Sequence, residues 1–240
     1  MRKSIRSVIG LMSNIMIRAG CRLFRFSNPS LHSRRWSNSE LKKIARLASG
    51  QVINVSGWRD SDKEGGVYRD YFSSSSSYVV SNIEGYAGKS TAGDIFLDLE
   101  MELPSELIGK YDVVFNHTTL EHVYDADLAF NNLCRLAKDL VIIVVPFMQV
   151  EHWSNGSFSD YSRFTEFRIR RLFEENGLTT IYLSSNHNPC FPIYYFAVGS
   201  RNPSEWSEVF KSIRSGLAFG NDQNGNEISF RGIADFEIMK

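Results

Sequence analysis

YDVVFNHTTLEHVYDADLAFNNLCRLAKDLVIIVVPF, residues 111–147, is the stretch that decides the fold. Its two ends, 111–116 and 140–147, are apolar runs rich in Val and Ile, as expected for strands buried on both faces of a sheet. Between them, 125–139 carries apolar side chains at helical spacing, at Leu128, Ala129, Leu133 and Leu136. A strand, a helix and a strand in this order predict a parallel α/β unit.

Five further apolar runs lie outside this stretch. Three precede it, at 51–56, 78–83 and 94–99, and two follow it, at 178–184 and 192–200. Each has the length and composition of a strand, so the chain alternates between strands and helical segments. This alternation predicts a doubly wound α/β sheet. The serine run 73–77 is expected to be a surface loop.

Capping and stop signals mark two more helices within this pattern. A helix capped by Ser37 or Ser39 is predicted to end at Gly50. A second helix is predicted to begin behind a capping Thr165 and to stop at Gly177.

The composition is that of a globular protein with a sizeable core. The chain has 240 residues, of which 42% are hydrophobic, and its formal net charge is zero, so nothing attracts it as a whole to nucleic acid. The three cysteines, Cys21, Cys134 and Cys190, form no CxxC pair, which argues against a disulfide framework or a zinc site and favours the reducing cytoplasm. No apolar run reaches the roughly 20 residues that cross a bilayer.

The charge is unevenly distributed along the chain. No acidic residue precedes Glu40, whereas eight Arg and Lys residues do. Residues 4–24 add apolar side chains at helical spacing, which predicts a basic amphipathic helix. Such a helix packs on the domain or is partly disordered, the interpretation we favour, or it lies on an anionic membrane surface. We therefore divide the chain into an N-terminal extension (1–36), an α/β domain (37–200) and a C-terminal helix and tail (201–240).

The residues that follow each strand form the candidate site, because open α/β sheets bind ligands at the carboxyl ends of their strands. In chain order they are Ser56, Gly57, Asn82, Glu84, Asp98, Asn116 and His117, followed by a loop that contains His152 and Asp160. A glycine lets the backbone approach a ligand closely, and a carboxylate after the second strand can accept both hydroxyls of a ribose. Acids at two successive strand ends, beside a glycine loop, indicate a ligand site.

The stretch 111–147 resembles the fourth strand, helix and fifth strand of class I S-adenosylmethionine-dependent methyltransferases. The resemblance rests on DVV, LEHV, a helix that ends near RL and a strand that enters VPF. The following histidine, then DYSRFT and the helix RRLFEENGL, are similar to a subgroup with an H…DYxRFT segment. The resemblance spans about residues 50–200. It implies a Rossmann-like sheet of seven strands, mostly parallel, with the last strand antiparallel.

The same resemblance implies S-adenosylmethionine as the cofactor. Ser56 and Gly57 would hold its methionine part, and Asp98 would accept a hydrogen bond from the adenine amine. His117, which follows Asn116 at the end of the fourth strand, would border the donor methyl group.

The chain departs from the family pattern at two places. Asn54 stands where an acid is common, and SGW replaces the usual glycine pair. The acid after the second strand is displaced, because Asn82 ends the strand and Glu84 comes two residues later. Glu84 is the preferred ribose ligand, since it alone is anionic there.

The loop after the fifth strand covers the acceptor side in this fold, so His152 is the first candidate for a catalytic base. His117 and Asp160 are second candidates, because a methyl acceptor that is a hydroxyl must lose its proton. Alternatively, Asp160 and Arg163 pair only to pin the loop. Glu121 and its neighbour in LEH are expected to be framework.

These features predict a methyltransferase that acts at an oxygen of a small-molecule or glycan acceptor. The glycan acceptor follows from the resemblance, because relatives with the H…DYxRFT segment accompany polysaccharide-modifying enzymes. Aromatic side chains of the site loops could face sugar rings or pack as a lid: Trp58, Trp153, Phe158 and Tyr161. The altered glycine loop leaves a catalytically weak or inactive binding or scaffold protein as the alternative. A nicotinamide-dependent dehydrogenase is disfavoured, because its G-x-G-x-x-G loop is missing.

Overall fold

The computed structural model describes residues 2–83, 95–186, 190–211, 220–221 and 227–228. Seven strands form the main sheet: β1 (Gly50–Val55), β2 (Ser75–Asn82), β3 (Ile95–Phe96), β4 (Tyr111–His117), β5 (Ala137–Met148), β6 (Thr179–Ser185) and β7 (Ile193–Ser200). Their order is β3-β2-β1-β4-β5-β7-β6. Neighbours run parallel except at β7, which is antiparallel to both β5 and β6. The seven predicted strands and the antiparallel last strand are confirmed.

The serine run was predicted as a surface loop, and this is wrong for its second half. Ser75 and Ser77 pair with Gly50 and Gln51, so they begin β2. Their side chains lie at the solvent-exposed start of the strand, where serine is tolerated without a packing cost.

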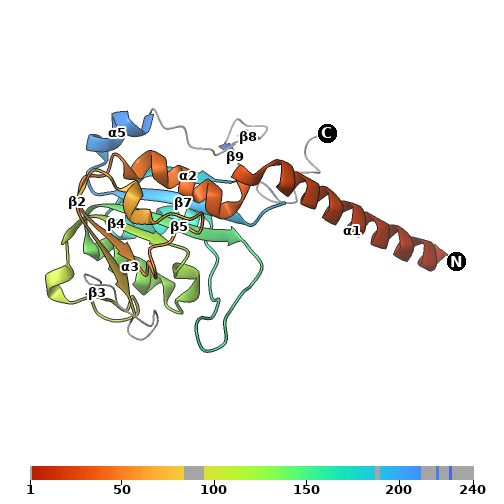
Figure 1. Ribbon diagram of the computed structural model, residues 1–240, viewed down its shortest axis with the longest axis horizontal. Coiled ribbons are helices and arrows are strands. Elements are labelled where there is room, and N and C mark those ends of the chain that lie inside the picture. The colour runs from red at the N-terminus through yellow and green to blue at the C-terminus, as the bar shows by residue number, and fades with distance from the viewer. Residues whose placement is uncertain (1, 84–94, 187–189, 212–219, 222–226, 229–240) are drawn as a thin grey trace.

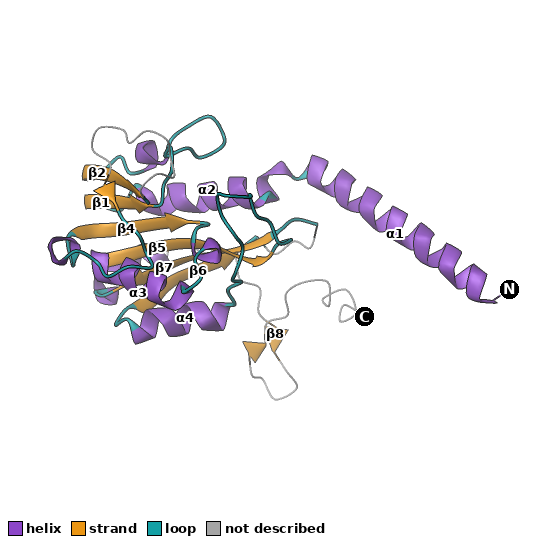
Figure 2. Cartoon of the chain, turned by 90° about the horizontal axis from the view of Figure 1, so that it is seen from below, coloured by secondary structure: helices purple, strands orange, loops and turns teal. Residues whose placement is uncertain are grey.

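Helices cover both faces of the sheet (Figure 1). On one face lie α3 (Ala126–Leu136) and α4 (Glu166–Glu175), whose Phe130 and Phe173 rings meet edge to face at 5.0 Å inside a buried core. On the other face lies α2 (Ser33–Ala45), with Leu41 fully buried (Figure 2). The predicted C-terminal helix is α5 (Pro203–Lys211), which packs against the same core as α2. Two further strands, β8 (Gly220–Asn221) and β9 (Glu227–Ile228), pair separately.

Side-chain caps set the N-terminal ends of α3 and α4, and the cap of α4 was predicted. The Asp125 carboxylate accepts from Leu128 N at 2.9 Å, and the Thr165 hydroxyl accepts from Arg168 N at 3.2 Å. Gly177, after α4, has φ 71°, the left-handed conformation that glycine adopts without strain.

The predicted ends of α2 are wrong. The helix begins at Ser33 behind His32, so Ser37 lies inside it, and it ends at Ala45. Gly50 begins β1 and does not end the helix. The expected boundary between an extension and a domain, at 36/37, therefore falls inside α2. Trp36 and Ser37 are buried against the sheet, so the folded unit includes this whole helix.

The predicted N-terminal helix is present as α1 (Arg2–Ser27), which projects away from the sheet (Figure 1). Its side chains from residue 7 to 20 are exposed except for a half-buried Ser13, so this part does not pack on the domain, which was one of the two forms of the favoured interpretation. In the described part of the chain, no helix has the length and apolar character needed to cross a membrane.

The register of the central strands brings the predicted site residues to one edge. Val55 lies opposite both Ser81 of β2 and Asn116 of β4, and His117 lies opposite Val144 of β5. The residues that follow β1, β2 and β4 thus emerge at the same level.

Candidate active site at the carboxyl edge of the sheet

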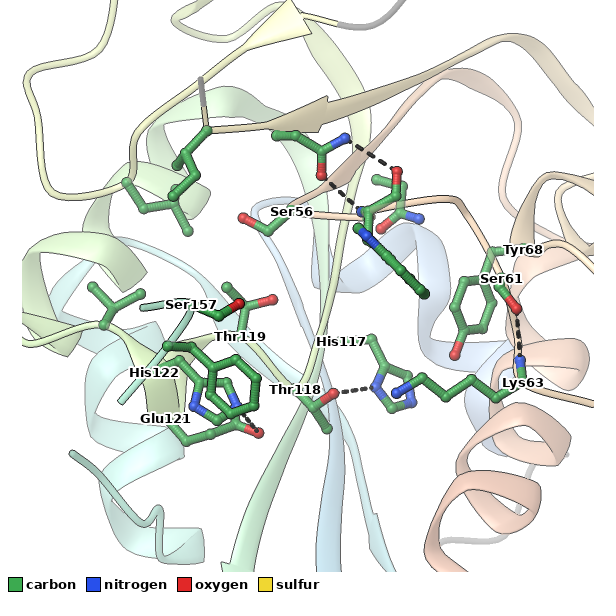
Figure 3. A pocket seen from close by; sticks show the side chains of 18 of the residues that line it. Ser56, Ser61, Lys63, Tyr68, His117, Thr118, Thr119, Glu121, His122 and Ser157 are labelled. Carbon is green, nitrogen blue, oxygen red and sulfur yellow. Dashed lines mark hydrogen bonds and ion pairs between the residues drawn. The ribbon is translucent and has the colours of Figure 1, made fainter. Parts of the chain in front are cut away.

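A cavity of about 490 Å³ opens at this edge, within the size range of small-molecule sites. Its lining comes from the loops after β1, β2, β3 and β4 and from the loop after β5, and Figure 3 shows two facing groups of side chains. Of the predicted residues, the cavity brings together Asn54, Ser56, Gly57, Asn82, Asp98, His117 and His152.

The loop after β1 has a strained backbone that is held by side-chain amides. Ser56 and Trp58 have φ of 57° and 50°, a conformation that residues other than glycine rarely adopt. The Asn82 amide braces it on both sides: its Oδ1 accepts from Trp58 N at 2.7 Å, and its Nδ2 donates to Trp58 O at 3.1 Å. The predicted ribose contact from Asn82 therefore competes with this structural role.

Packing explains the glycine at position 57. A Cβ there would lie 2.5 Å from Asn54 Nδ2 and 2.9 Å from Val80 Cγ1, closer than real contacts allow. Asn54 in turn donates to Asp60 Oδ1 at 2.8 Å, and Tyr78 donates to the same oxygen at 2.6 Å. Asn54 thus shapes the loop through Asp60, at the position where the family pattern has an acid.

The acids predicted to bind the cofactor after β2 and β3 are Glu84 and Asp98, and of these Asp98 lies within the described residues. Asp98 is exposed and lines the cavity, and its Oδ1 accepts from Glu100 N at 2.9 Å. This turn leaves its second carboxylate oxygen available to a ligand. Glu84, the preferred ribose ligand, lies outside the described residues.

His117 stands in one wall of the cavity, between the Arg34 guanidinium and the Ser37 hydroxyl. Arg34 Nη1 lies 2.7 Å from Nδ1, and Ser37 Oγ lies 2.8 Å from Nε2. Burial and then the Arg34 charge hold the pKa of His117 well below its usual value. His117 is therefore a neutral imidazole, whose nitrogens are already engaged by Arg34 and Ser37.

Lys63 completes a cationic patch beside His117, and Figure 3 shows its side chain reaching towards that ring. Burial and the neighbouring Arg34 lower the pKa of Lys63. Asn116, by contrast, is fully buried under this wall and does not line the cavity. Its Nδ2 donates to Val55 O at 2.9 Å, so it ties β4 to β1.

Glu121 lies in the opposite wall, in a short 3₁₀ turn over Leu120–His122. Its side chain is 1% exposed, and its Oε2 has no hydrogen-bond partner among the described residues. Burial raises the pKa of Glu121 to about 8. A buried carboxyl group at a cavity wall with a free oxygen can offer a proton to a ligand at neutral pH.

His152 lies next to this group, in the loop after β5. Its Nδ1 is 3.0 Å from Asp160 Oδ2, and its ring meets the His122 ring edge to face at 4.9 Å. Asp160 also binds Arg163, and this hydrogen bond holds the pKa of Asp160 at about 2. Asp160 is not among the cavity-lining residues. Its ion pair with Arg163, which was predicted as the structural alternative, is present.

The predicted aromatic residues divide into two groups. Trp58 and Phe158 line the cavity, whereas Trp153 and Tyr161 lie outside the lining and are more than half exposed. In the described part of the chain, no group of three or more His, Cys, Asp and Glu side chains is placed to hold a metal ion.

Three residues of the site were not predicted from the sequence. Arg34 was assigned to an extension outside the domain and Glu121 to the framework, and Lys63 was given no role. The large apolar side chain of Trp36, in the predicted extension, was the sequence signal near Arg34, and the structure buries it within α2. Nothing in the local pattern around Lys63 or Glu121 distinguishes them from solvated loop charges.

Similar proteins were found among solved structures only. No family model and no curated protein matches the chain. Burkholderia thailandensis 1,6-didemethyltoxoflavin-N1-methyltransferase, with bound 1,6-didemethyltoxoflavin and S-adenosylhomocysteine, is 15% identical, with a TM-score of 0.51 over 81% of this chain and 88% of its own. The fold is a Rossmann-like methyltransferase fold. A chain of the Haloferax volcanii complex that contains the Trm112 methyltransferase activator is 13% identical, with a TM-score of 0.52 over 77% of this chain and 96% of its own.

Proposed function

We propose that this protein is an S-adenosylmethionine-dependent methyltransferase. The observation that carries the proposal is the cavity at the carboxyl edge of a methyltransferase-type sheet, lined by residues that follow β1 to β4. Open α/β sheets bind their ligands at this edge. The similar toxoflavin-precursor methyltransferase holds S-adenosylhomocysteine, which supports the choice of cofactor.

The cavity has groups that match the parts of this cofactor. Asp98 offers an exposed carboxylate, which can accept a hydrogen bond from the adenine amine. Arg34 and Lys63 provide positive charge, which complements the carboxylate of the methionine part. Ser56 and Gly57 lie in the loop after β1, on the lining. Glu84 remains the preferred ribose ligand, because the Asn82 amide is bound to Trp58.

S-adenosylmethionine supplies a methyl group on a sulfonium centre, which needs no further activation. The chain must hold the acceptor in line and exclude water, and this positioning accounts for most of the expected acceleration. A hydroxyl acceptor must also lose its proton. We assign this step to His152, because Asp160 at Nδ1 orients the ring and the described residues make no hydrogen bond to Nε2.

The acceptor we propose is a small molecule or a glycan that is methylated at oxygen. Glu121 and Gln149 support a ligand rich in hydroxyl groups, because each has a buried oxygen without a partner among the described residues. Trp58 and Phe158 add aromatic surface to the lining, which suits the apolar face of a sugar ring.

Calorimetric titration with S-adenosylhomocysteine tests the proposal. We expect binding by the wild-type chain, and we expect Asp98→Ala to weaken it by about 1 to 3 kcal/mol, through loss of a hydrogen bond to a charged acceptor. Asp70→Ala is the matched control, since Asp70 is exposed and lies outside the cavity lining.

The alternative is a methyltransferase fold that serves as a binding or scaffold module. The side chains of Asn54 and Asn82 motivate this alternative, because both amides hydrogen-bond to other groups of the protein in place of a cofactor. Lack of binding at millimolar S-adenosylhomocysteine and S-adenosylmethionine by the folded chain would favour this alternative.

A further inference from the structure

The apolar side chains of α1 are exposed to an unusual degree. Seven of them between Val8 and Ile17 are at least half exposed, although large apolar residues normally lie inside a domain: Val8, Ile9, Leu11, Met12, Ile15, Met16 and Ile17. Leu23 and Phe26 continue the series at 69% and 87% exposed. A contiguous exposed apolar surface of this kind marks an interaction site.

Most of these side chains share one face of the helix. The positions 8, 11, 12, 15, 16, 19, 23 and 26 recur at intervals of three and four residues, which places them along a single apolar stripe. Ile17 lies on the opposite face, among small and polar residues such as Gly10, Ser13 and Asn14.

The charge of the helix has one sign. Arg2, Lys3, Arg6, Arg18, Arg22 and Arg25 lie within α1, and no acidic residue precedes Glu40. A helix with an apolar stripe, basic residues along and beside it and no acid fits an anionic lipid surface, which offers apolar depth and negative charge together.

The last turns of α1 fix the helix to the domain. The Phe24 ring meets Phe191 edge to face at 6.2 Å, and the Arg25 guanidinium lies 5.7 Å from the same ring. Cys21 Sγ lies 2.7 Å from Cys190 Sγ. Soon after, the chain enters α2, where Arg34 lines the cavity. The exposed part of α1 is thus joined to the candidate site by a short, packed connection.

We propose that α1 binds the surface of an anionic lipid bilayer, with its apolar stripe buried at the headgroup boundary. It would lie in the plane of the surface, since no described helix is able to cross a membrane. The inference is independent of the proposed reaction, because it rests on α1 alone. Binding would hold the cavity close to the lipid surface.

Co-sedimentation of the full chain with vesicles tests this. We expect binding to vesicles of phosphatidylcholine mixed with phosphatidylglycerol, weaker binding to phosphatidylcholine alone, and weakening by salt. Ile15→Glu should reduce binding about tenfold or more, because it places a charge in the stripe. Ile17→Glu is the matched control: it makes the same change at a similarly exposed position, 64% against 58%, on the opposite face. It should reduce binding clearly less.

Three results would overturn the proposal. The first is equal loss of binding in Ile15→Glu and Ile17→Glu, which would show that only net charge matters, as for a polyanion such as RNA. The second is binding to neither kind of vesicle. The third is a dimer in light scattering without lipid that Ile15→Glu dissociates while vesicle binding is unchanged, which would assign the stripe to a second copy of the chain. Unchanged thermal unfolding of both variants excludes misfolding as the cause of a loss.

Discussion

At the scale of single residues, two of the three histidines that line the cavity, His117 and His152, differ in which ring atoms are occupied. His117 has Arg34 at Nδ1 and Ser37 at Nε2, and its pKa is well below the usual value because it is buried and lies near a guanidinium. His152 has a carboxylate at Nδ1, from Asp160. An imidazole that is oriented at one nitrogen and open at the other suits proton transfer, whereas a neutral and fully engaged one suits positioning.

His152→Ala is therefore expected to reduce turnover with a hydroxyl acceptor by about 100-fold or more while leaving S-adenosylhomocysteine affinity nearly unchanged. The reason is that, in the function we propose, His152 serves the acceptor and the loop after β1 serves the cofactor. Methyl transfer and calorimetry measure the two effects. Trp153→Ala is the control, since Trp153 neighbours His152 but is 67% exposed and outside the lining. Loss of cofactor binding in His152→Ala would show that this histidine holds the cofactor.

Glu121 gives a prediction on pH. Burial raises its pKa from 4.5 to about 8, so the folded state retains a proton that the unfolded state loses between these values. This contribution to stability is fully present below pH 4.5 and is lost as the pH rises through about 8. The free energy of unfolding should fall with pH across this window, by up to about 1.4 kcal/mol per pH unit. Denaturant unfolding between pH 5 and 9 measures the slope.

Glu121→Gln should flatten this slope, because an amide of the same shape does not titrate. Glu174→Gln is the control, since the Glu174 side chain is 74% exposed and its replacement should leave the slope as it is. A wild-type slope that persists in Glu121→Gln would assign the pH dependence to other groups.

At the scale of secondary-structure elements, the strands were predicted from the sequence because the buried part of each one is a short run of apolar residues. The boundaries of the helices were predicted less accurately. The start of α2 at Ser33 is set by contact with the sheet, which buries Trp36, and not by a local cap. Arg34 was missed for this reason. Glu121 was missed because its burial depends on the loop after β5, whose Tyr161 N donates to Glu121 O at 2.7 Å.

The contact between α4 and β7 allows a test of packing. A Cβ on Gly199 would lie 2.5 Å from Phe173 Cδ1, and Phe173 is fully buried, so its ring has to displace other core atoms to make room. Gly199→Ala should lower the free energy of unfolding by about 1 to 3 kcal/mol, which exceeds the gain from a less flexible unfolded chain. Gly10→Ala is the control, because a Cβ on Gly10 in α1 has no atom within 4 Å. Equal stability of Gly199→Ala and wild type would mean that α4 shifts freely on the sheet.

At the scale of the whole molecule, the positive and negative charges are concentrated in different parts of the chain. The chain has a net charge of zero, yet its first 39 residues hold eight cations and no acid. The remainder is correspondingly acidic. The sequence predicted this division and the helix that carries it, but not that α1 projects from the domain, because an amphipathic pattern does not specify what covers its apolar face.

The exposure of α1 predicts that the domain is stable without it. Residues 7–20 bury almost nothing against the rest of the chain, and the contacts that fix the helix begin at Cys21 and Phe24. Deletion of residues 1–20 should therefore change the midpoint of thermal unfolding by less than about 3 °C, the shift expected for roughly 1 kcal/mol in a domain of this size. S-adenosylhomocysteine binding should be unaffected, since Arg34 and the loops of the cavity remain. A larger fall in the midpoint, measured by calorimetry in the absence of lipid, would mean that the stripe of α1 is covered by the domain itself in solution, and the fold would then include the helix as a structural layer.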